Sequence, residues 1–98
     1  MIQGTTPTIS IKLPMDVSRV VEAEFVLAGL SGIIKAWTLE NMIAEGDSLK
    51  LMLTQEETFA LEPHRYDAQL RVKTTDGKVM ATRKMHLYVE DLISEVIL

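Results

Sequence analysis

The side chains that could carry out acid–base chemistry are few and widely spaced. His64 and His86 are the two histidines, and the predicted pairing of their strands places Asp67 opposite His86. A carboxylate beside an imidazole is a pair that catalytic sites use to orient a general base. On an open strand face the same pair is an ordinary surface ion pair, contributing well under about 1 kcal/mol. The second interpretation is favoured.

No other group of residues points to catalysis or to a bound metal ion. Glu56 and Glu57 are adjacent, so their carboxylates diverge on a helix, and a capping role accounts for Glu57. The histidines lack the spacing of metal ligands, no glycine-rich phosphate loop occurs, and the serines lack a nucleophile-elbow context. The absence of cysteine excludes thiolate chemistry, disulfides and cysteine-held metals. We expect no enzymatic activity and no cofactor.

Aromatic rings offer a second kind of site, a platform for stacking sugars or bases. Phe25, Phe59 and Tyr66 fall in patterns typical of a core. Tyr88 and Trp37 could face solvent, and such platforms need exposed rings with polar or basic neighbours. Two candidates make a weak platform, and packing in the core or at its rim is favoured for them.

The C-terminal stretch, residues 90–98, is the feature that best fits a protein partner. Such an apolar segment would be an interaction arm if exposed. It either extends the last strand and folds back on its own domain, or docks on another copy or a neighbouring protein, with edge pairing as the mode. The residues predicted to bind a partner are Leu92, Ile93, Val96, Ile97 and Leu98, with Tyr88 and Trp37.

Turn-forming residues recur at short intervals, and the runs between them alternate between apolar and polar positions. One buried and one wet face is typical of antiparallel sheets. We predict an all-β fold, an Ig-like antiparallel β-sandwich of about seven strands with one short helical turn. The runs predicted as strands are Thr8 to Leu13, Val21 to Leu27, Ile33 to Leu39, Ser48 to Thr54, Arg65 to Lys73 and Lys78 to Val89.

The alternation also predicts which side chains of these strands face the core. The face of the run from Ile33 to Leu39 is not settled by its pattern. The predicted inward residues are Ile9, Ile11, Leu13, Val21, Ala23, Phe25, Leu27, Leu49, Leu51, Leu53, Tyr66, Ala68, Leu70 and Val72.

Asp76-Gly77 between two alternating runs predicts a hairpin with a two-residue type I′ turn. The resulting register pairs Val72 with Ala81 on the inner face. Arg83 would then face the core, which a bulge or a place at the sandwich rim would resolve.

A second hairpin turns at residues 29–32. A three-residue loop with Gly32 in the left-handed region turns Trp37 towards Phe25, whereas a two- or four-residue loop sends Trp37 outward. We favour a buried Trp37.

A short helix is predicted after the run that ends at Thr54. Thr54 at the N-cap and Glu57 three residues later match a capping box, and Pro63 ends the segment. Phe59 or Leu61 would plug the end of the core.

Size and charge bound what the chain can be. Its 98 residues form one domain, residues 1–98, with residues 90–98 as a possible interaction tail. A net charge of −4 argues against nonspecific binding to nucleic acid or anionic membranes. There is no signal-peptide pattern and no apolar run long enough to span a bilayer. We expect a soluble protein made in the cytosol, as a virion component would also be, with no small-molecule substrate.

Four stretches carry a resemblance to a known group of proteins: residues 2–9, 13–18, 53–58 and 75–82. They resemble short proteins encoded in phages and prophages of Firmicutes and gut bacteria, often met near tail or baseplate genes. The layout is also similar to the Ig-like N-terminal domain of phage baseplate upper proteins. The shared motifs are turns and a cap, and the resemblance brings no catalytic residues.

These observations predict a non-enzymatic structural module of a phage or prophage particle, associated with the tail or baseplate. It would act through sheet edges and the apolar tail, on a protein partner or on itself. The alternative is a carbohydrate- or other ligand-binding β-sandwich module that uses Trp37 and Tyr88.

Overall fold

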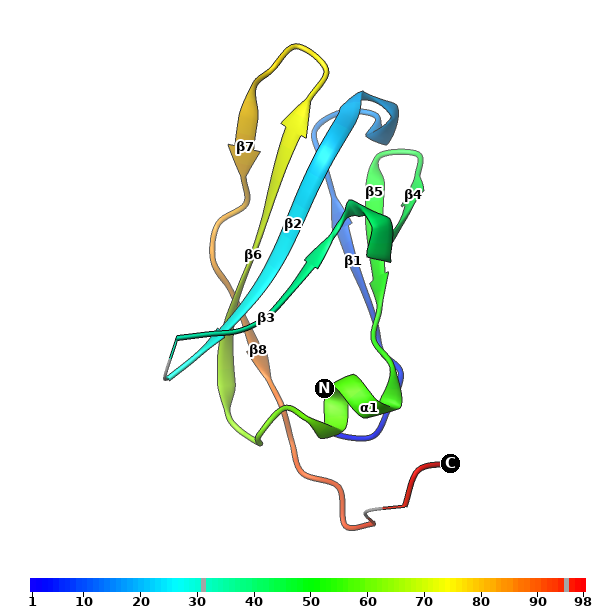
Figure 1. Cartoon of the computed structure of the whole chain (residues 1–98), viewed down its shortest axis with the longest axis vertical. Coiled ribbons are helices and arrows are strands. Elements are labelled where there is room, and N and C mark those ends of the chain that lie inside the picture. Colours follow the sequence, from blue (N-terminus) through cyan, green and yellow to red (C-terminus); the bar gives the residue numbers. More distant parts are fainter. Residues whose placement is uncertain (31, 95) are drawn as a thin grey trace.

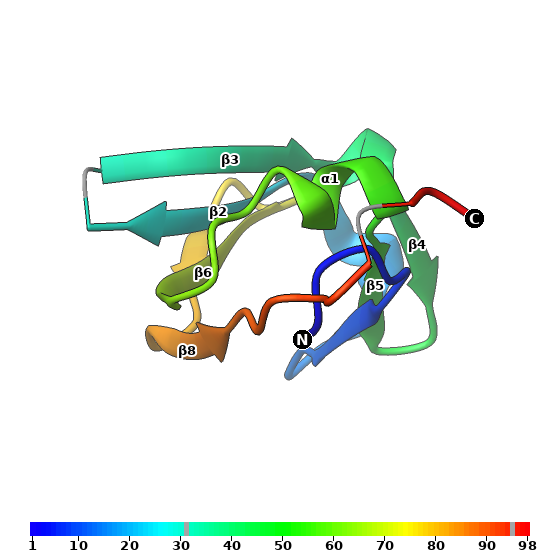
Figure 2. The same ribbon diagram turned by 90° about the horizontal axis from the view of Figure 1, so that it is seen from below.

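Two antiparallel β-sheets pack face to face and bury the core between them (Figures 1 and 2). This computed structural model describes residues 1–30, 32–94 and 96–98, without the side chain of Ile34. Strands make up 52% of it. The elements are β1 (Thr8–Lys12), η1 (Val17–Arg19), β2 (Val20–Gly29), β3 (Gly32–Thr38), η2 (Leu39–Asn41), β4 (Met42–Glu45), β5 (Ser48–Met52), α1 (Gln55–Phe59), β6 (Arg65–Thr74), β7 (Val79–Ala81) and β8 (Met85–Tyr88).

The smaller sheet has the order β1-β5-β4, and the larger has the order β3-β2-β6, with β6 pairing β7 near one end and β8 near the other. The predicted all-β sandwich with one short helix is therefore confirmed. The described residues form eight named strands where about seven were expected. The predicted runs did not include β4, and the run predicted from Lys78 to Val89 is interrupted between β7 and β8.

The core lies where the alternation of apolar residues predicted it. Ile9 and Ile11, on the edge strand β1, also face inward but are only partly buried. The buried apolar residues are Leu13, Val20, Ala23, Phe25, Leu27, Trp37, Leu49, Leu51, Leu53, Leu61, Tyr66, Ala68, Leu70, Val72 and Val89.

Val21 does not face the core, so this part of the inward assignment is wrong. Its side chain is 49% exposed, and Val20 is buried in its place. The pairing of β2 with β6 shifts between Val20 and Glu22. An extra residue at such a bulge reverses the alternation that follows it, and the apolar pair Val20-Val21 hides that shift in the sequence.

The hairpin at Asp76-Gly77 has a different turn from the one predicted. No described non-glycine residue has a positive φ, whereas Gly77 has a φ of 82°. A type I′ turn needs positive φ at both central positions. The Thr74 N–H donates to the Lys78 carbonyl over 2.9 Å, which closes a three-residue loop. The Asp76 carboxylate accepts a hydrogen bond from the Thr74 hydroxyl inside that loop.

The extra loop residue moves the register near the turn by one position. Val72 pairs with Met80, not with Ala81 as predicted, so Met80 packs against the core and Ala81 is exposed. At the other end of β6 the predicted pairing of Asp67 with His86 is confirmed. The β6–β7 pairing and the β6–β8 pairing differ by one residue, and the change occurs in the break between β7 and β8, where Arg83 is exposed. The irregularity expected to keep Arg83 out of the core is thus present.

Trp37 is buried, as favoured. The hairpin brings it there by a pairing that differs from the predicted three-residue loop. Gly29 pairs with Gly32, and the register then shifts so that Phe25 still pairs with Trp37. The predicted three-residue loop includes Ser31, which lies outside the described residues. The two rings are tilted at 46° with centroids 6.0 Å apart, a favourable arrangement for an aromatic pair.

The predicted capping box begins α1. The Glu57 N–H donates to Thr54 Oγ1 over 3.1 Å, and the Thr54 N–H donates to Glu57 Oε1 over 2.9 Å. The second carboxylate oxygen, Oε2, accepts the indole N–H of Trp37 over 2.7 Å. Glu57 therefore caps the helix and also ties it to β3, so capping is only part of its role.

The ionisation of Glu57 follows from these contacts. Partial burial alone would raise the pKa of Glu57, but the hydrogen bonds from Thr54 and Trp37, with the nearby Lys35 ammonium, outweigh it. The pKa therefore lies below its ordinary value of 4.5. Lys35 Nζ also lies 5.9 Å from the Trp37 ring centroid, within reach of a cation–π interaction.

Removing the Glu57 carboxylate should destabilise the fold through two contacts at once. We expect Glu57→Ala to lower the free energy of unfolding by about 2–3 kcal/mol, from a lost cap and an unpaired buried indole N–H. Glu56→Ala, on the same helical turn, is the matched control and should change it by less than about 0.5 kcal/mol. Urea denaturation measures both. Equal effects would contradict the role given to Glu57.

The same carboxylate should give stability a pH dependence of defined sign. The folded chain holds the pKa of Glu57 below 4.5, so the unfolded chain binds more protons on the acid side. The stabilisation is present above about pH 4.5 and is lost as pH falls through the folded pKa. We expect Glu57→Gln to lose less free energy of unfolding than wild type between pH 7 and about pH 3. Parallel losses in the two chains would contradict this.

Candidate functional site

The predicted partner-binding residues of the C-terminal tail lie at the end of the sandwich beside α1 (Figure 1). Ile93 and Leu98 are fully exposed, Val96 is 67% exposed and Ile97 is 48% exposed. Leu92, at 36%, is the least exposed of the five. Among its described residues, the tail does not continue β8, which ends at Tyr88, and it does not bury these side chains in the core.

The tail is fastened where it leaves the domain. The Gln3 N–H donates to the Glu90 carbonyl over 2.9 Å, and the Glu90 N–H donates to the Met1 carbonyl over 2.8 Å. These bonds form an isolated parallel bridge between Ile2 and Glu90. Val89, just before it, is buried in the core. The exposed part of the tail thus begins from a fixed point.

Gly4 makes room for the next contact. It has a φ of +72°, and a Cβ there would lie 2.5 Å from Phe59 Cζ and 3.0 Å from Leu92 Cδ2. The turn near the N-terminus therefore packs directly under the helix and the start of the tail. A Cβ at this position would force the Phe59 ring to shift. Leu61 is buried and Phe59 is half-buried, so Leu61 is the predicted plug that reaches the core.

Past Leu92 the tail has few polar contacts. The Leu98 N–H donates to Gln55 Oε1 over 3.0 Å, and the Val96 N–H donates to Ser94 Oγ over 3.2 Å. Within the described part of the tail, no backbone-to-backbone hydrogen bond is made beyond Glu90. An apolar segment with unpaired backbone groups is able to add to a sheet edge.

The two residues predicted as an aromatic platform, Trp37 and Tyr88, differ in solvent exposure. Trp37 is 4% exposed, and Tyr88 is 61% exposed. A buried indole bound to Glu57 is not available to stack on a ligand, so a platform would rest on Tyr88 alone. The sandwich does not bring these two rings together on its surface.

The predicted pair of Asp67 and His86 lies on the surface. His86 Nδ1 lies 2.9 Å from Asp67 Oδ1, with both side chains about half exposed. His64 stacks on Tyr66, with ring centroids 4.1 Å apart. Among the described residues, no group of three or more His, Asp or Glu side chains is placed to hold a metal ion. The arrangement suits the ion-pair interpretation of Asp67 and His86.

The outer face of the larger sheet carries an open groove of about 860 Å³. Two of its charges, Glu24 and Arg71, form an ion pair at 3.1 Å. The side chains around it are of mixed charge. Its lining residues include Val21, Glu22, Glu24, Arg71, Lys73 and Val79.

Comparison with known proteins adds no relative: no family model, curated protein or solved structure matches the chain. Within the described residues, no helix is long and apolar enough to cross a membrane.

The sequence did not indicate two residues that contribute to the surface around the base of the C-terminal tail. Ile2 is 43% exposed and joins the tail through its bridge to Glu90. Gly4 permits the approach of Phe59 and Leu92. A glycine beside a predicted strand is a general signal for a turn, but nothing in the sequence indicates which side chains it must accommodate.

Gly4→Ala should separate the close packing at the base of the tail from backbone strain alone. Gly46 has a similar φ of +61° with open space around it, so Gly46→Ala is the matched control. We expect Gly46→Ala to cost about 1 kcal/mol from its left-handed backbone. Gly4→Ala should cost about 1–3 kcal/mol more, because the added methyl collides with Phe59. Equal costs in urea denaturation would show that the contact is not tight.

Proposed function

We propose that this protein is a non-enzymatic structural and assembly module that acts through protein–protein contacts. The observation that carries the proposal is the exposure of the tail, in which Ile93, Val96, Ile97 and Leu98 lie in solvent beside a folded core. Exposed apolar clusters on a small domain mark sites where another protein binds. The fixed base at Glu90 holds the cluster at one end of the molecule.

The energy available from this surface is substantial. Fully burying one aliphatic side chain contributes about 1.5–3 kcal/mol, and four such side chains are exposed in the tail. Ordering the tail and losing free rotation on association opposes that gain. A single tail–partner contact is therefore suited to a reversible, concentration-dependent assembly. Several copies acting together would hold more tightly.

We also propose the finer assignment of the sandwich as Ig-like. Tyr66 is the second residue of β6, at the corner where the chain enters this strand from α1, and its hydroxyl donates to the Glu62 carbonyl over 2.9 Å. A tyrosine at this corner that bonds back to the upstream backbone is a feature of Ig-type domains. Burial and the Glu62 carboxylate raise the pKa of Tyr66, which the bond to the Glu62 backbone partly opposes.

The setting we propose is a phage or prophage particle, in its tail or baseplate region. Support for this comes from the likeness of residues 2–9, 13–18, 53–58 and 75–82 to short phage-encoded proteins. Particles of this kind are built from repeated contacts between identical or neighbouring subunits. An exposed apolar tail on a small rigid sandwich suits such a role.

Polar substitution in the tail should abolish association without affecting folding. We expect Ile93→Ser/Val96→Ser to stay monomeric, and to lose binding to phage tail particles, under conditions where the wild type associates. Val21→Ser/Ile43→Ser changes the same residue types at exposed positions elsewhere and is the matched control. Sedimentation velocity and co-sedimentation with purified particles are the measurements.

Two results would overturn the assembly role. One is a wild-type chain that neither self-associates at high concentration nor binds particles. The other is association that persists unchanged in the tail variant. Circular dichroism should show that all three chains are folded.

A further inference from the structure

The strand β1 forms one edge of the smaller sheet, and its inward apolar side chains are incompletely covered. Ile9 and Ile11 point towards the core from β1 but remain only partly buried. Across the sandwich Met80, Met85 and Leu87, on the edge strands β7 and β8, are also partly buried against the core. One side of the sandwich is therefore lined by apolar side chains that its own strands do not finish covering.

The backbone of β1 is free along this side. Leu13 N–H donates to Asp47, and Leu53 N–H donates to Pro7, so the residues of odd number in β1 bond to β5. Bonding and non-bonding pairs alternate in an antiparallel ladder, so the N–H and C=O groups of Thr8, Ser10 and Lys12 point away from β5. Within the described residues, none of these groups takes part in a backbone hydrogen bond outside the strand ladders.

The opposite side of the sandwich is better covered at β3, although Leu39 and Met42 next to it are also only partly buried. The edge strand β3 there presents Trp37 to the core, and its indole is sealed by the bond to Glu57. A bulge near Leu27 and Ala28 also disturbs the pairing of β3 at its loop end. Bulges of this kind make an edge a poor template for an added strand. The β4 edge is only four residues long, Met42–Glu45.

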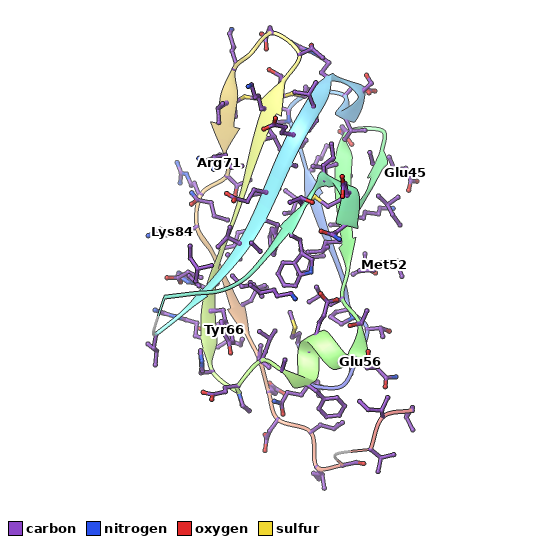
Figure 3. All side chains as sticks on the ribbon, in the orientation of Figure 1. Glu45, Met52, Glu56, Tyr66, Arg71 and Lys84 are labelled. Carbon is purple, nitrogen blue, oxygen red and sulfur yellow. The ribbon has the colours of Figure 1, made fainter. Side chains whose placement is uncertain are left out.

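The tail has the properties of the missing strand. Residues 92–98 would span about 23 Å when extended, against about 17 Å for the five residues of β1. Isoleucine and valine at these positions favour a strand. The acidic residues Glu90 and Asp91 are opposite in charge to Arg83 and Lys84, which are exposed between β7 and β8; Lys12 on β1 already pairs with Asp47 at 3.7 Å. Figure 3 shows Lys84 projecting away from the sheets.

We propose that the tail of a second copy of this chain pairs with the free edge of β1 and covers Ile9 and Ile11. The tail of the same chain does not reach that edge, because it runs past α1 and places the Leu98 N–H on Gln55. This inference rests on the proposed function and names its partner as another copy. Edge addition by an extended segment is an established mode of recognition.

Matched edge prolines test this pairing in the full-length chain. The Ser10 N–H points outward from β1, so Ser10→Pro removes an edge donor without breaking a bond to β5. By the same alternation the backbone N–H of Ala44 points away from β5 at the free edge of β4. Ala44→Pro therefore also removes an edge donor without breaking a bond to β5, and it is the control. We expect Ser10→Pro to raise the self-dissociation constant by at least about tenfold, and Ala44→Pro to leave it unchanged. Circular dichroism checks that both variants fold.

Disulfide trapping provides a test that does not depend on the proline variants. Since the chain has no cysteine, Ser10→Cys and Ser94→Cys, placed in separate chains, can form a mixed disulfide only between copies. We expect this disulfide to form much faster than one between Ser94→Cys and Ala36→Cys on the β3 edge. Mass spectrometry of the linked peptides identifies each product.

The outcomes separate this inference from the assembly role. Preferential linkage to Ala36→Cys, or self-association that is insensitive to Ser10→Pro, would overturn the pairing at β1 and leave a tail-driven assembly in place. A chain that is monomeric but binds particles through its tail would also overturn it. Absence of any tail-dependent association would overturn both proposals.

Discussion

The shared carboxylate of Glu57 is the contact on which the arrangement of the sandwich depends. Its two oxygens accept from the Thr54 backbone and from the Trp37 indole, so one side chain begins the helix and fixes an edge strand of the opposite sheet. Among the described residues, the bond from the Trp37 indole to Glu57 is the side-chain hydrogen bond that links α1 to β3. Apolar contacts hold surfaces together without fixing their orientation, whereas two hydrogen bonds to one carboxylate do fix it.

That bond also makes the two sides of the sandwich unequal. On the β3 side, Trp37 is buried and its polar atom is paired. On the β1 side, the inward residues Ile9 and Ile11 stay partly exposed. A chain of 98 residues has a limited core, and this one leaves Ile9 and Ile11 on β1, like Leu39 and Met42 near β4, only partly buried. The surface left to interact is therefore a strand edge and a tail, and does not depend on an enclosed cavity.

How much the sequence predicts depends on how local the cause is. Alternation identified the inward faces of β5 and β6, and the capping box was visible in Thr54 and Glu57 because it spans four residues. The turn at Gly77 and the bulge beside Val21 were missed, because one added residue reverses a face without changing the apolar pattern. The bond from Trp37 to Glu57 joins residues distant in sequence, and no local pattern encodes it. The tail was recognised from composition, but its exposure follows from the bridge at Glu90 and the packing around Gly4.

The short length of β1 that is available for pairing determines what kind of assembly it would support. Pro14 follows the strand in the even-numbered set that faces the free edge, and proline supplies no N–H to a ladder, so the outward donors of β1 end at Lys12 and an added strand can pair only over a short stretch. A long sheet growing from edge to edge is thereby disfavoured, which is how natural sheets avoid aggregation. The tail and the edge are different surfaces, so one contact between them is heterologous. Reciprocal exchange between two copies would close it into a symmetric dimer, and exchange in one direction would build a ring or a chain of subunits.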